Sequence, residues 1–322
     1  MDDSGPLWDN THRAFLQSFL ARQTLTFSAA RPLLAKIQTA NDPARPVPEN
    51  DIMKEDFEHY IQALNDAISP FDLEIRSTEP QSGRGEQIWA LVNTTSDAMT
   101  QMATSHSADE IAYVKKVIDA MFETNNTRAR EVMAVSSMDA LQLAREGGGG
   151  GRRETGTQPQ PGTFNLTQSQ AEKTLRSMVL ENWFEESPNN YFSLSPRALM
   201  ELRGWLIDTY NDQDPASDDE TEQPHQKIKF CAACKSILTI GQRCPDMDCP
   251  ARLHNHCVAK MWAAQGRREE CPTCKTAWQN PGPVGEKAAR RSRQSGGASG
   301  RVSSGRRRTQ GSNMDGGEDS DD

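Results

Sequence analysis

All seven cysteines of this 322-residue chain fall between residues 231 and 274. Two Cys-x-x-Cys pairs and one Cys-x4-Cys pair account for six of them; the seventh is Cys257, and His254 and His256 lie just before it. A Cys-x-x-Cys turn presents two thiolates to one ion, and Zn²⁺ prefers four sulfur or nitrogen ligands in a tetrahedron. An odd number of cysteines arranged in such pairs favours metal over disulfides, and a reducing compartment. The segment therefore predicts a zinc domain.

Eight of these side chains form four ligand pairs, enough for two zinc ions. In zinc modules of this kind the pairs alternate, so that the first and third bind one ion and the second and fourth bind the other. The expected ligands are Cys231, Cys234, His254 and Cys257 for site one, and Cys244, Cys249, Cys271 and Cys274 for site two. His256 is the alternative histidine ligand, but His254 has the usual His-x-x-Cys spacing. The other interpretation, buried free thiols without metal, gives no reason for this spacing.

Both expected sites are closed, because four protein ligands leave no open position for a water or a substrate. The two zinc ions are therefore expected to be structural. A domain this small cannot bury a sufficient apolar core by itself. Metal binding, worth about 10–16 kcal/mol for a structural zinc site in small peptides, then supplies the folding free energy.

Residues 11–100 are expected to form a first winged-helix domain, preceded by a disordered segment at 1–10. Apolar residues recur at helical spacing, and an alternating hairpin with a turn at Gly83 and Gly85 follows. The expected helices are residues 11–22, 28–39 and 51–68, and the expected strands are residues 73–75 and 88–92. Three helices followed by two strands is the winged-helix order.

Residues 101–211 are expected to form a second winged-helix domain, interrupted by a glycine-rich insert at 146–163. Thr167 and Gln170 have the spacing of a capping box, and Ser195-Pro196 is typical of a helix start. The expected helices are residues 109–122, 127–145, 167–183 and a last one from 195, with a second wing at residues 184–194.

Segments of low complexity flank the zinc domain, which is expected at residues 227–280. Residues 212–226 form an acidic linker, and residues 281–322 form a basic and then acidic tail that is expected to be disordered. Two basic clusters in this tail are spaced as in a bipartite nuclear-import signal. Their residues are Arg290, Arg291, Arg293, Arg306, Arg307 and Arg308. The same arginines would give weak, salt-sensitive contact with DNA; the alternative is a solvated tail.

The charge balance argues against a protein that coats nucleic acid, because the net charge is −9. The third expected helix is acidic and would be repelled by phosphates. It carries Asp51, Glu55, Asp56, Glu58 and Asp66 against Lys54. We therefore expect the winged helices to bind protein through an apolar groove, with plain scaffold domains as the alternative. No apolar run approaches a membrane span and no leader pattern occurs, so we expect a soluble intracellular protein without a membrane partner.

Several stretches together resemble the non-SMC element one family, the variant-RING subunit of the SMC-type complex devoted to DNA repair. They are Cys231–Cys234, Gly241–Cys244, Leu253–Lys260, Cys271–Cys274, Phe71–Arg76, Ala90–Asn93 and Tyr191–Arg197. The likeness covers about residues 11 to 280 apart from the glycine-rich insert. It implies an α+β chain in which tandem winged-helix domains precede a small two-zinc cross-brace RING-like domain.

The resemblance implies a nuclear RING-type ubiquitin ligase, active in DNA repair and recombination with a MAGE-like non-SMC partner. A RING forms no covalent intermediate; it orients a ubiquitin-loaded conjugating enzyme, so no catalytic residue is expected. The matching contact positions are Ala233, Trp262, Pro272 and Lys275. Ala233 stands where a larger aliphatic residue is usual. Lys275 stands where arginine is usual, and lysine lacks the planar, forked guanidinium group of arginine. These departures predict weak or partner-dependent activity, and core packing is the alternative role of Trp262.

Two other functions stay open at this point. A PHD finger has the same ligand order and reads histone tails, and the four-residue gap before His254 suits it. PHD fingers usually carry an aromatic residue two positions before the seventh ligand, where this chain has Glu269. The other alternative is a structural subunit whose zinc domain only docks partners.

Overall fold

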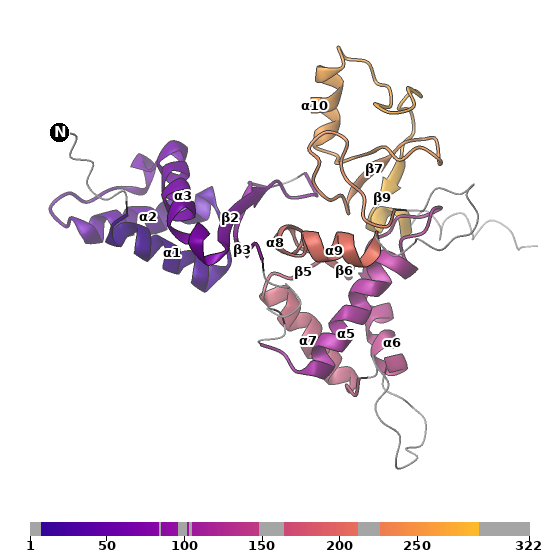
Figure 1. The fold of residues 1–322 in the computed structure, drawn as a ribbon, viewed down its shortest axis with the longest axis horizontal. Coiled ribbons are helices and arrows are strands. Elements are labelled where there is room, and N and C mark those ends of the chain that lie inside the picture. Colours follow the sequence, from indigo (N-terminus) through magenta and orange to yellow (C-terminus); the bar gives the residue numbers. More distant parts are fainter. Residues whose placement is uncertain are drawn as a thin grey trace, which may run out of the picture.

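The computed structural model describes residues 8–83, 85–95, 102, 105–147, 164–211 and 226–289. These residues form a first unit (8–95), a second unit (105–211) and a zinc module (226–289), an α+β arrangement. Helices α8 and α9 of the second unit lie at the centre, between the first unit, the zinc module and the remaining helices of the second unit (Figure 1). The predictions for the glycine-rich insert after residue 147, the acidic linker and the tail arginines concern residues outside the described ranges.

The first unit packs three helices against a small antiparallel sheet in which β3 lies between β1 and β2. Its elements are α1 (Asn10–Arg22), β1 (Thr24–Thr26), α2 (Phe27–Asn41), the turn η1 (Glu49–Asp51), α3 (Lys54–Ile68), the turn η2 (Ser69–Phe71), β2 (Leu73–Thr78) and β3 (Ile88–Asn93). The three predicted helices and the hairpin are confirmed. Strand β1 was missed, since three residues are too few to show an alternating pattern. Asp9 caps α1 by accepting from the backbone of Thr11 and His12, so Asp9 and Asn10, which were predicted to be disordered, are part of the ordered unit.

The second unit repeats the helix-and-sheet pattern with β6 between β4 and β5. Its elements are α5 (Ala108–Asp119), the π-helical turn η3 (Ala120–Thr124), β4 (Val135–Ser136), α6 (Ser137–Gly147), α7 (Gln168–Leu180), β5 (Phe184–Glu186), β6 (Tyr191–Leu194), α8 (Pro196–Glu201) and α9 (Arg203–Tyr210). The capping box of Thr167 and Gln170 and the cap at Ser195 are confirmed. The helix predicted over 127–145 is wrong in its first part, because residues 127–134 form an irregular segment that buries Glu131.

The zinc module has a small sheet with β7 between β8 and β9, and helix α10 beside it. Its elements are β7 (Gly241–Arg243), β8 (Arg252–Leu253), α10 (Cys257–Ala264) and β9 (Gly282–Val284). Strand β9 pairs with β7, so the module continues beyond residue 280, where the sequence analysis ended it. The Gly-Pro sequence of this strand is typical of a linker. In the structure, however, a Cβ on residue 282 would lie 2.7 Å from the Arg243 side chain, so this close approach of the backbone to Arg243 requires Gly282.

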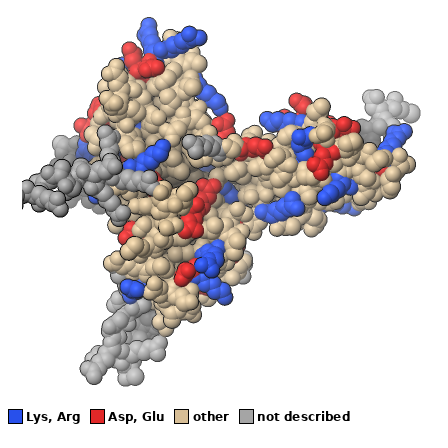
Figure 2. All heavy atoms as spheres, turned by 180° about the vertical axis from the view of Figure 1, so that it is seen from behind, with Lys and Arg blue, Asp and Glu red and all other residues tan. Residues whose placement is uncertain are grey.

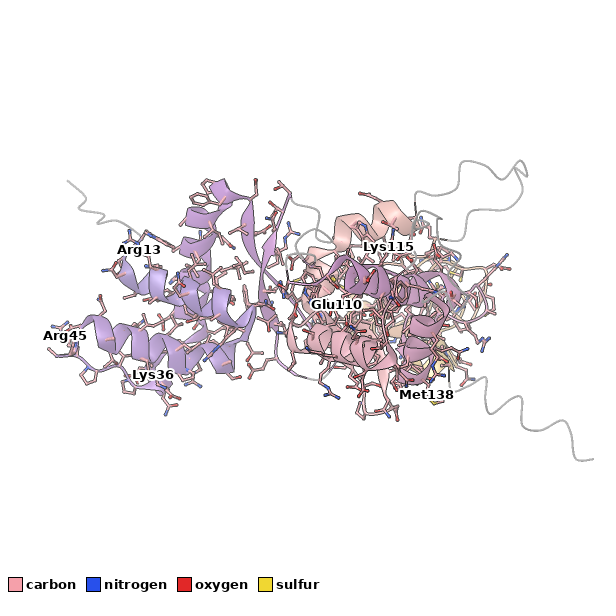
Figure 3. All side chains as sticks on the ribbon, turned by 90° about the horizontal axis from the view of Figure 1, so that it is seen from below. Arg13, Lys36, Arg45, Glu110, Lys115 and Met138 are labelled. Atoms are coloured by element: carbon pink, nitrogen blue, oxygen red, sulfur yellow. The ribbon has the colours of Figure 1, made fainter. Side chains whose placement is uncertain are left out.

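The buried apolar residues form two large clusters. One lies within the first unit. The other runs from the second unit into the zinc module and joins residues such as Phe122 and Leu206 to Ile228 and Leu253. Figure 3 shows the helices of the first unit, with Arg13, Lys36 and Arg45, to one side of Glu110, Lys115 and Met138. The second unit and the zinc module therefore share a core, whereas the first unit has its own.

In the described part of the chain, no helix combines the length and the apolar character that crossing a membrane requires.

Candidate metal centre

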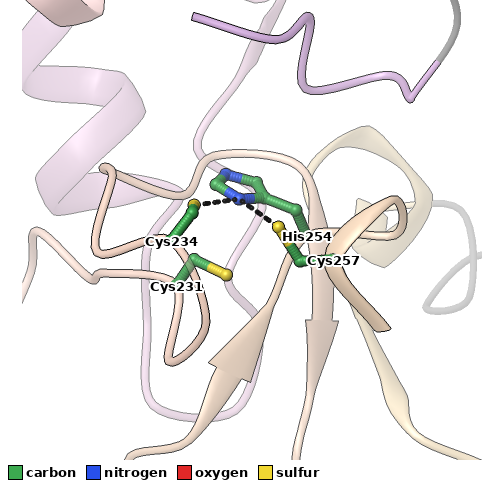
Figure 4. Close-up of side chains that lie close together, drawn as sticks. All are labelled: Cys231, Cys234, His254 and Cys257. Carbon is green, nitrogen blue, oxygen red and sulfur yellow. Dashed lines mark hydrogen bonds between the residues drawn. The ribbon is translucent and has the colours of Figure 1, made fainter. Parts of the chain in front are cut away.

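The structure brings the eight expected ligands together in the two expected sets, each with its ligand atoms within 4.8 Å of one another. In the first set (Figure 4), Nδ1 of His254 lies 3.3 Å from Sγ of Cys234 and 3.9 Å from Sγ of Cys257. In the second set, Sγ–Sγ distances of 3.5 Å join Cys244 to Cys274 and Cys249 to Cys271. Bonds of about 2.0–2.3 Å to a tetrahedral Zn²⁺ place ligand atoms roughly 3.5 Å apart. The geometry therefore suits two zinc ions, one with three sulfurs and one nitrogen and one with four sulfurs.

The two Cys-x-x-Cys pairs stand on turns of the same design, which we call knuckle one (residues 230–237) and knuckle two (residues 270–277). The backbone N–H of Lys235 donates to the carbonyl of Cys231 (2.9 Å), and that of Lys275 donates to the carbonyl of Cys271 (3.1 Å). Both lysines have a left-handed backbone with φ of 62°. One isolated β-bridge closes each turn. This backbone turns both cysteines of a pair toward one ion.

His254 is oriented by a hydrogen bond on the ring nitrogen that faces away from the cysteines. Its Nε2 lies 3.3 Å from the carbonyl oxygen of Ile237, which leaves Nδ1 as the metal-binding atom. The ring of His256 stacks on that of His254 with centroids 5.0 Å apart, and its Nε2 lies 3.4 Å from Oε2 of Glu79. His256 thus faces the first unit, and the geometry favours His254 as the ligand.

A fully buried carboxylate, Glu131 of the second unit, holds three cations of the zinc module. Arg252 donates from Nε to Oε2 (2.7 Å) and from Nη2 to Oε1 (2.6 Å), and Lys229 donates to Oε1 (2.6 Å). Arg243 lies 3.4 Å from the same oxygen. Burial alone would raise the pKa of Glu131, but Arg252 and Lys229 outweigh burial and hold it at about 2. Burial lowers the pKa of Lys229 to about 8, against the opposing effect of Glu131.

This carboxylate braces the loop of the second zinc site through the two arginines. Arg252 donates from Nη1 to the carbonyl of Cys249 (2.6 Å), and Arg243 donates from Nη2 to the carbonyl of Met247 (2.9 Å). Glu131 was not expected at this site, because the sequence predicted a helix over residues 127–145. The one signal available was the basic residues close to the ligands, which need a counter-charge if they are buried.

The four expected contact positions for a conjugating enzyme lie on knuckle one, helix α10 and knuckle two. Ala233 and Pro272 are half-buried, and the ring of Trp262 meets that of Trp278 edge-on at 5.7 Å. The Nζ of the exposed Lys275 donates to the carbonyl of Pro272 (3.1 Å). Ala233 also lines a cavity of about 480 Å³ between the zinc module and the first unit.

Two interleaved four-ligand clusters fit both RING-like and PHD-like modules, and residues 231–274 match the family model for RING-like domains. Residues 12–202, more than half of the chain, match the family model described as the Nse1 non-SMC component of the SMC5-6 complex. The chain therefore belongs to the Nse1 family.

Curated relatives agree with this membership. The non-structural maintenance of chromosomes element 1 homolog of Homo sapiens is 23% identical over 274 residues, 85% of this chain and 86% of the relative. The homolog of Xenopus laevis is 22% identical over 285 residues, 85% of each chain. A solved chain of an Nse1-Nse3-Nse4 complex has 22% identity and a TM-score of 0.62, over 87% of this chain and 99% of that one, and shares the fold.

Proposed function

We propose that this chain is the RING-type ubiquitin ligase subunit of an SMC-type chromosome maintenance and DNA repair complex. The supporting observation is the pair of alternating ligand sets within a RING-like module of an Nse1-family chain. Two bound zinc ions would hold both knuckles and helix α10 in one arrangement. A conjugating enzyme would then meet Ala233, Trp262 and Pro272 on a preformed surface.

The ligase acts by position alone. The module binds the ubiquitin-loaded conjugating enzyme and restricts the thioester to orientations open to attack, which is catalysis by proximity and orientation. Lys275 would hydrogen-bond the ubiquitin, after its Nζ leaves the carbonyl of Pro272. Bound zinc ions would activate no water, because all four ligands of each site would come from the protein.

The N-terminal units are proposed to be tandem winged-helix domains that bind partner proteins. In support, the first unit has the order helix, strand, two helices and a hairpin, with β3 central in its sheet, and the second unit repeats a central β6. On the face in Figure 2, acidic and basic side chains are interspersed over the first unit. In α3, Lys54 is paired with Glu58 at 3.4 Å. Mixed charges favour a protein partner over DNA.

The partner is proposed to be a MAGE-like non-SMC subunit. The solved complex that resembles this chain is titled with Nse1, Nse3 and Nse4, so a ternary assembly is the arrangement to test. Co-purification of the full chain with candidate subunits, followed by size-exclusion chromatography, would test the contact. Separate elution of the chain and the subunits would contradict it.

A gain-of-function variant tests the ligase proposal, because misfolding does not produce a gain. Ala233→Ile restores the larger aliphatic usual in RING ligases and should speed the discharge of ubiquitin from a loaded conjugating enzyme roughly fivefold or more, with the partner present. Ala232→Ile, one residue away on knuckle one, is the matched control. Trp262→Ala should slow discharge at unchanged zinc content. An unchanged rate in both Ala233→Ile and Trp262→Ala would contradict the proposal.

The structural alternative, a zinc module that only docks partners, is supported by the packing of Trp262 against Trp278. Under that function Trp262→Ala lowers thermal stability and leaves discharge at the background rate of the conjugating enzyme. A third candidate, a PHD-like module, would bind histone-tail peptides in a fluorescence titration.

Nuclear import is proposed to depend on the arginines at 290–293 and 306–308. The truncation that tests it must end after Ala289, because a cut at residue 280 removes strand β9 and damages the zinc module. Nuclear fluorescence that persists in the truncated chain would contradict an import role. The same truncation also tests DNA contact. Weak contact by the tail is supported if the full chain binds DNA less tightly as the salt concentration rises and the truncated chain does not bind it.

A further inference from the structure

Gln81, on the hairpin between β2 and β3 of the first unit, makes four hydrogen bonds to the zinc module. Its Oε1 accepts from the backbone N–H of Thr239 (2.7 Å), the hydroxyl of Thr239 (3.0 Å) and the backbone N–H of Ile240 (2.9 Å). Its Nε2 donates to the carbonyl of Ile237 (3.0 Å). The two backbone donors fix which atom of the amide is the oxygen, so the nitrogen must face Ile237.

The carbonyl of Ile237 is shared with a zinc ligand. Nε2 of His254 lies 3.3 Å from the same oxygen, which can accept two hydrogen bonds. The contact sets the tautomer of His254, so that the lone pair on Nδ1 faces the three cysteines. A partner that fixes a ligand in this way contributes to metal affinity although it does not touch the metal.

Two further contacts hold the hairpin in place beside the first zinc site. Oε1 of Glu79 accepts from Nζ of Lys260 on α10 (2.9 Å), and its Oε2 lies 3.4 Å from Nε2 of His256. A Cβ on Gly83, whose φ is +70°, would lie 3.6 Å from Cβ of His256. The hairpin therefore lies directly on the loop that carries His254.

The second zinc site depends on a different part of the chain. Arg252 donates to the carbonyl of Cys249, and Glu131 of the second unit holds Arg252 through two hydrogen bonds. The hairpin thus contacts the surroundings of the first site, whereas Glu131 braces the loop of the second site through Arg252, whose carbonyl also accepts from the backbone N–H of Ala232 on knuckle one (2.8 Å). A change at the hairpin should act on one metal ion and spare its neighbour.

We propose that Gln81 is a positioning residue for the first zinc site: by holding the carbonyl of Ile237, it keeps His254 turned toward the metal and ties that site to the first unit. The proposal deepens the zinc-binding part of the proposed function and is independent of ligase activity. Loss of the hydrogen-bond partner of a metal ligand typically lowers metal affinity roughly 10–100-fold, and Gln81 holds that partner, the carbonyl of Ile237, in place. The loss is expected at the site with one nitrogen ligand, and the four-sulfur site serves as an internal reference.

The test uses the full chain loaded with Co²⁺, because cobalt bound by three sulfurs and one nitrogen absorbs differently from cobalt bound by four sulfurs. In Gln81→Ala, a chelator titration should remove the metal of the mixed site at a roughly tenfold or more lower chelator concentration than in wild type. The four-sulfur spectrum should titrate as in wild type. Gln87→Ala is the matched control, since Gln87 lies on the same hairpin and donates to Ser77 (2.8 Å).

A second variant separates the N–H of Gln81, which donates to Ile237, from its oxygen, which accepts from Thr239 and Ile240. Gln81→Glu keeps an oxygen for Thr239 and Ile240 but loses the N–H that faces Ile237, so it should weaken the mixed site as much as Gln81→Ala does. Wild-type titration in Gln81→Glu would overturn the role of this donor. Equal weakening of both sites in Gln81→Ala, no weakening at all, or the same effect in Gln87→Ala would overturn the proposal.

Discussion

The two zinc sites have nearly the same local structure and different surroundings. Both knuckles turn at a lysine with φ of 62°, and each is closed by one β-bridge. Around site one, the first unit approaches through the neutral amide of Gln81 and the exposed ion pair of Glu79 with Lys260. Around site two, the second unit contributes the buried charge of Glu131. Sequence spacing thus determines how a knuckle folds, whereas contacts from distant residues determine how firmly it is held.

The energies of these two supports differ in kind. An exposed ion pair such as Glu79 with Lys260 contributes little, because solvent screens the two charges. Removal of a buried carboxylate such as Glu131 is strongly destabilising, because the cations around it would remain buried without a counter-charge. The shared apolar cluster adds to this second support. We therefore expect the zinc module to unfold together with the second unit and more independently of the first.

Loss of a ligand at site two is the largest expected effect and tests this linkage. Cys244→Ser should lower the zinc content, unfold the zinc module and reduce hydrogen-exchange protection in α5 and α9, while α1 to α3 stay protected. The core that the second unit shares with the zinc module extends the effect to the second unit, whereas the first unit has a core of its own and stays folded. Full protection of α9 in the variant, or an unchanged zinc content, would contradict the linkage.

The parts of the fold that follow a local pattern were predictable, and the parts set by distant contacts were not. The capping box at Thr167 and the amphipathic stripe of α3, with Phe57, Ile61 and Leu64, depend on residues three or four apart. The grouping of the zinc ligands follows from spacing in the same way. Glu131 and Gln81 have no local signal, because their roles arise from residues about 100 to 160 positions away in the chain.

Removal of the buried charge is the second largest expected effect. Glu131→Gln leaves Lys229, Arg243 and Arg252 without their carboxylate and should lower the free energy of unfolding by about 3–5 kcal/mol. Chemical denaturation of the zinc-loaded chain measures it. Glu172→Gln, which removes the exposed partner of Arg176, should cost under about 0.5 kcal/mol. Equal, small losses of stability in both variants would show that the charge of Glu131 does not couple the second unit to the zinc module.

The difference in stability between wild type and Glu131→Gln should depend on pH. This dependence distinguishes the effect of Glu131 from that of the cysteine ligands. The pKa of Glu131 lies at about 2 in the folded chain against an ordinary value of 4.5, so its stabilisation is present above pH 4.5 and is lost as the pH falls toward 2. Cysteine ligands also take up protons in acid, but they do so in wild type and in Glu131→Gln alike. The stability gap between the two proteins should therefore narrow below pH 4.5. If the difference in stability stayed constant down to the lowest pH at which both proteins fold, the effect of Glu131→Gln would not come from the loss of the charge.

The smallest expected effect concerns the two knuckle lysines, which share a backbone conformation but differ in place. Lys275→Arg supplies a planar fork at the position where RING ligases usually carry arginine, so ubiquitin discharge should rise a few-fold at unchanged zinc content. Lys235→Arg makes the same substitution at the matching position of knuckle one, with the same φ of 62°, and should leave the rate unchanged. A gain in both variants would assign the effect to general positive charge. A gain confined to Lys275 would mean that two knuckles of one design differ in function because only one of them faces the ubiquitin.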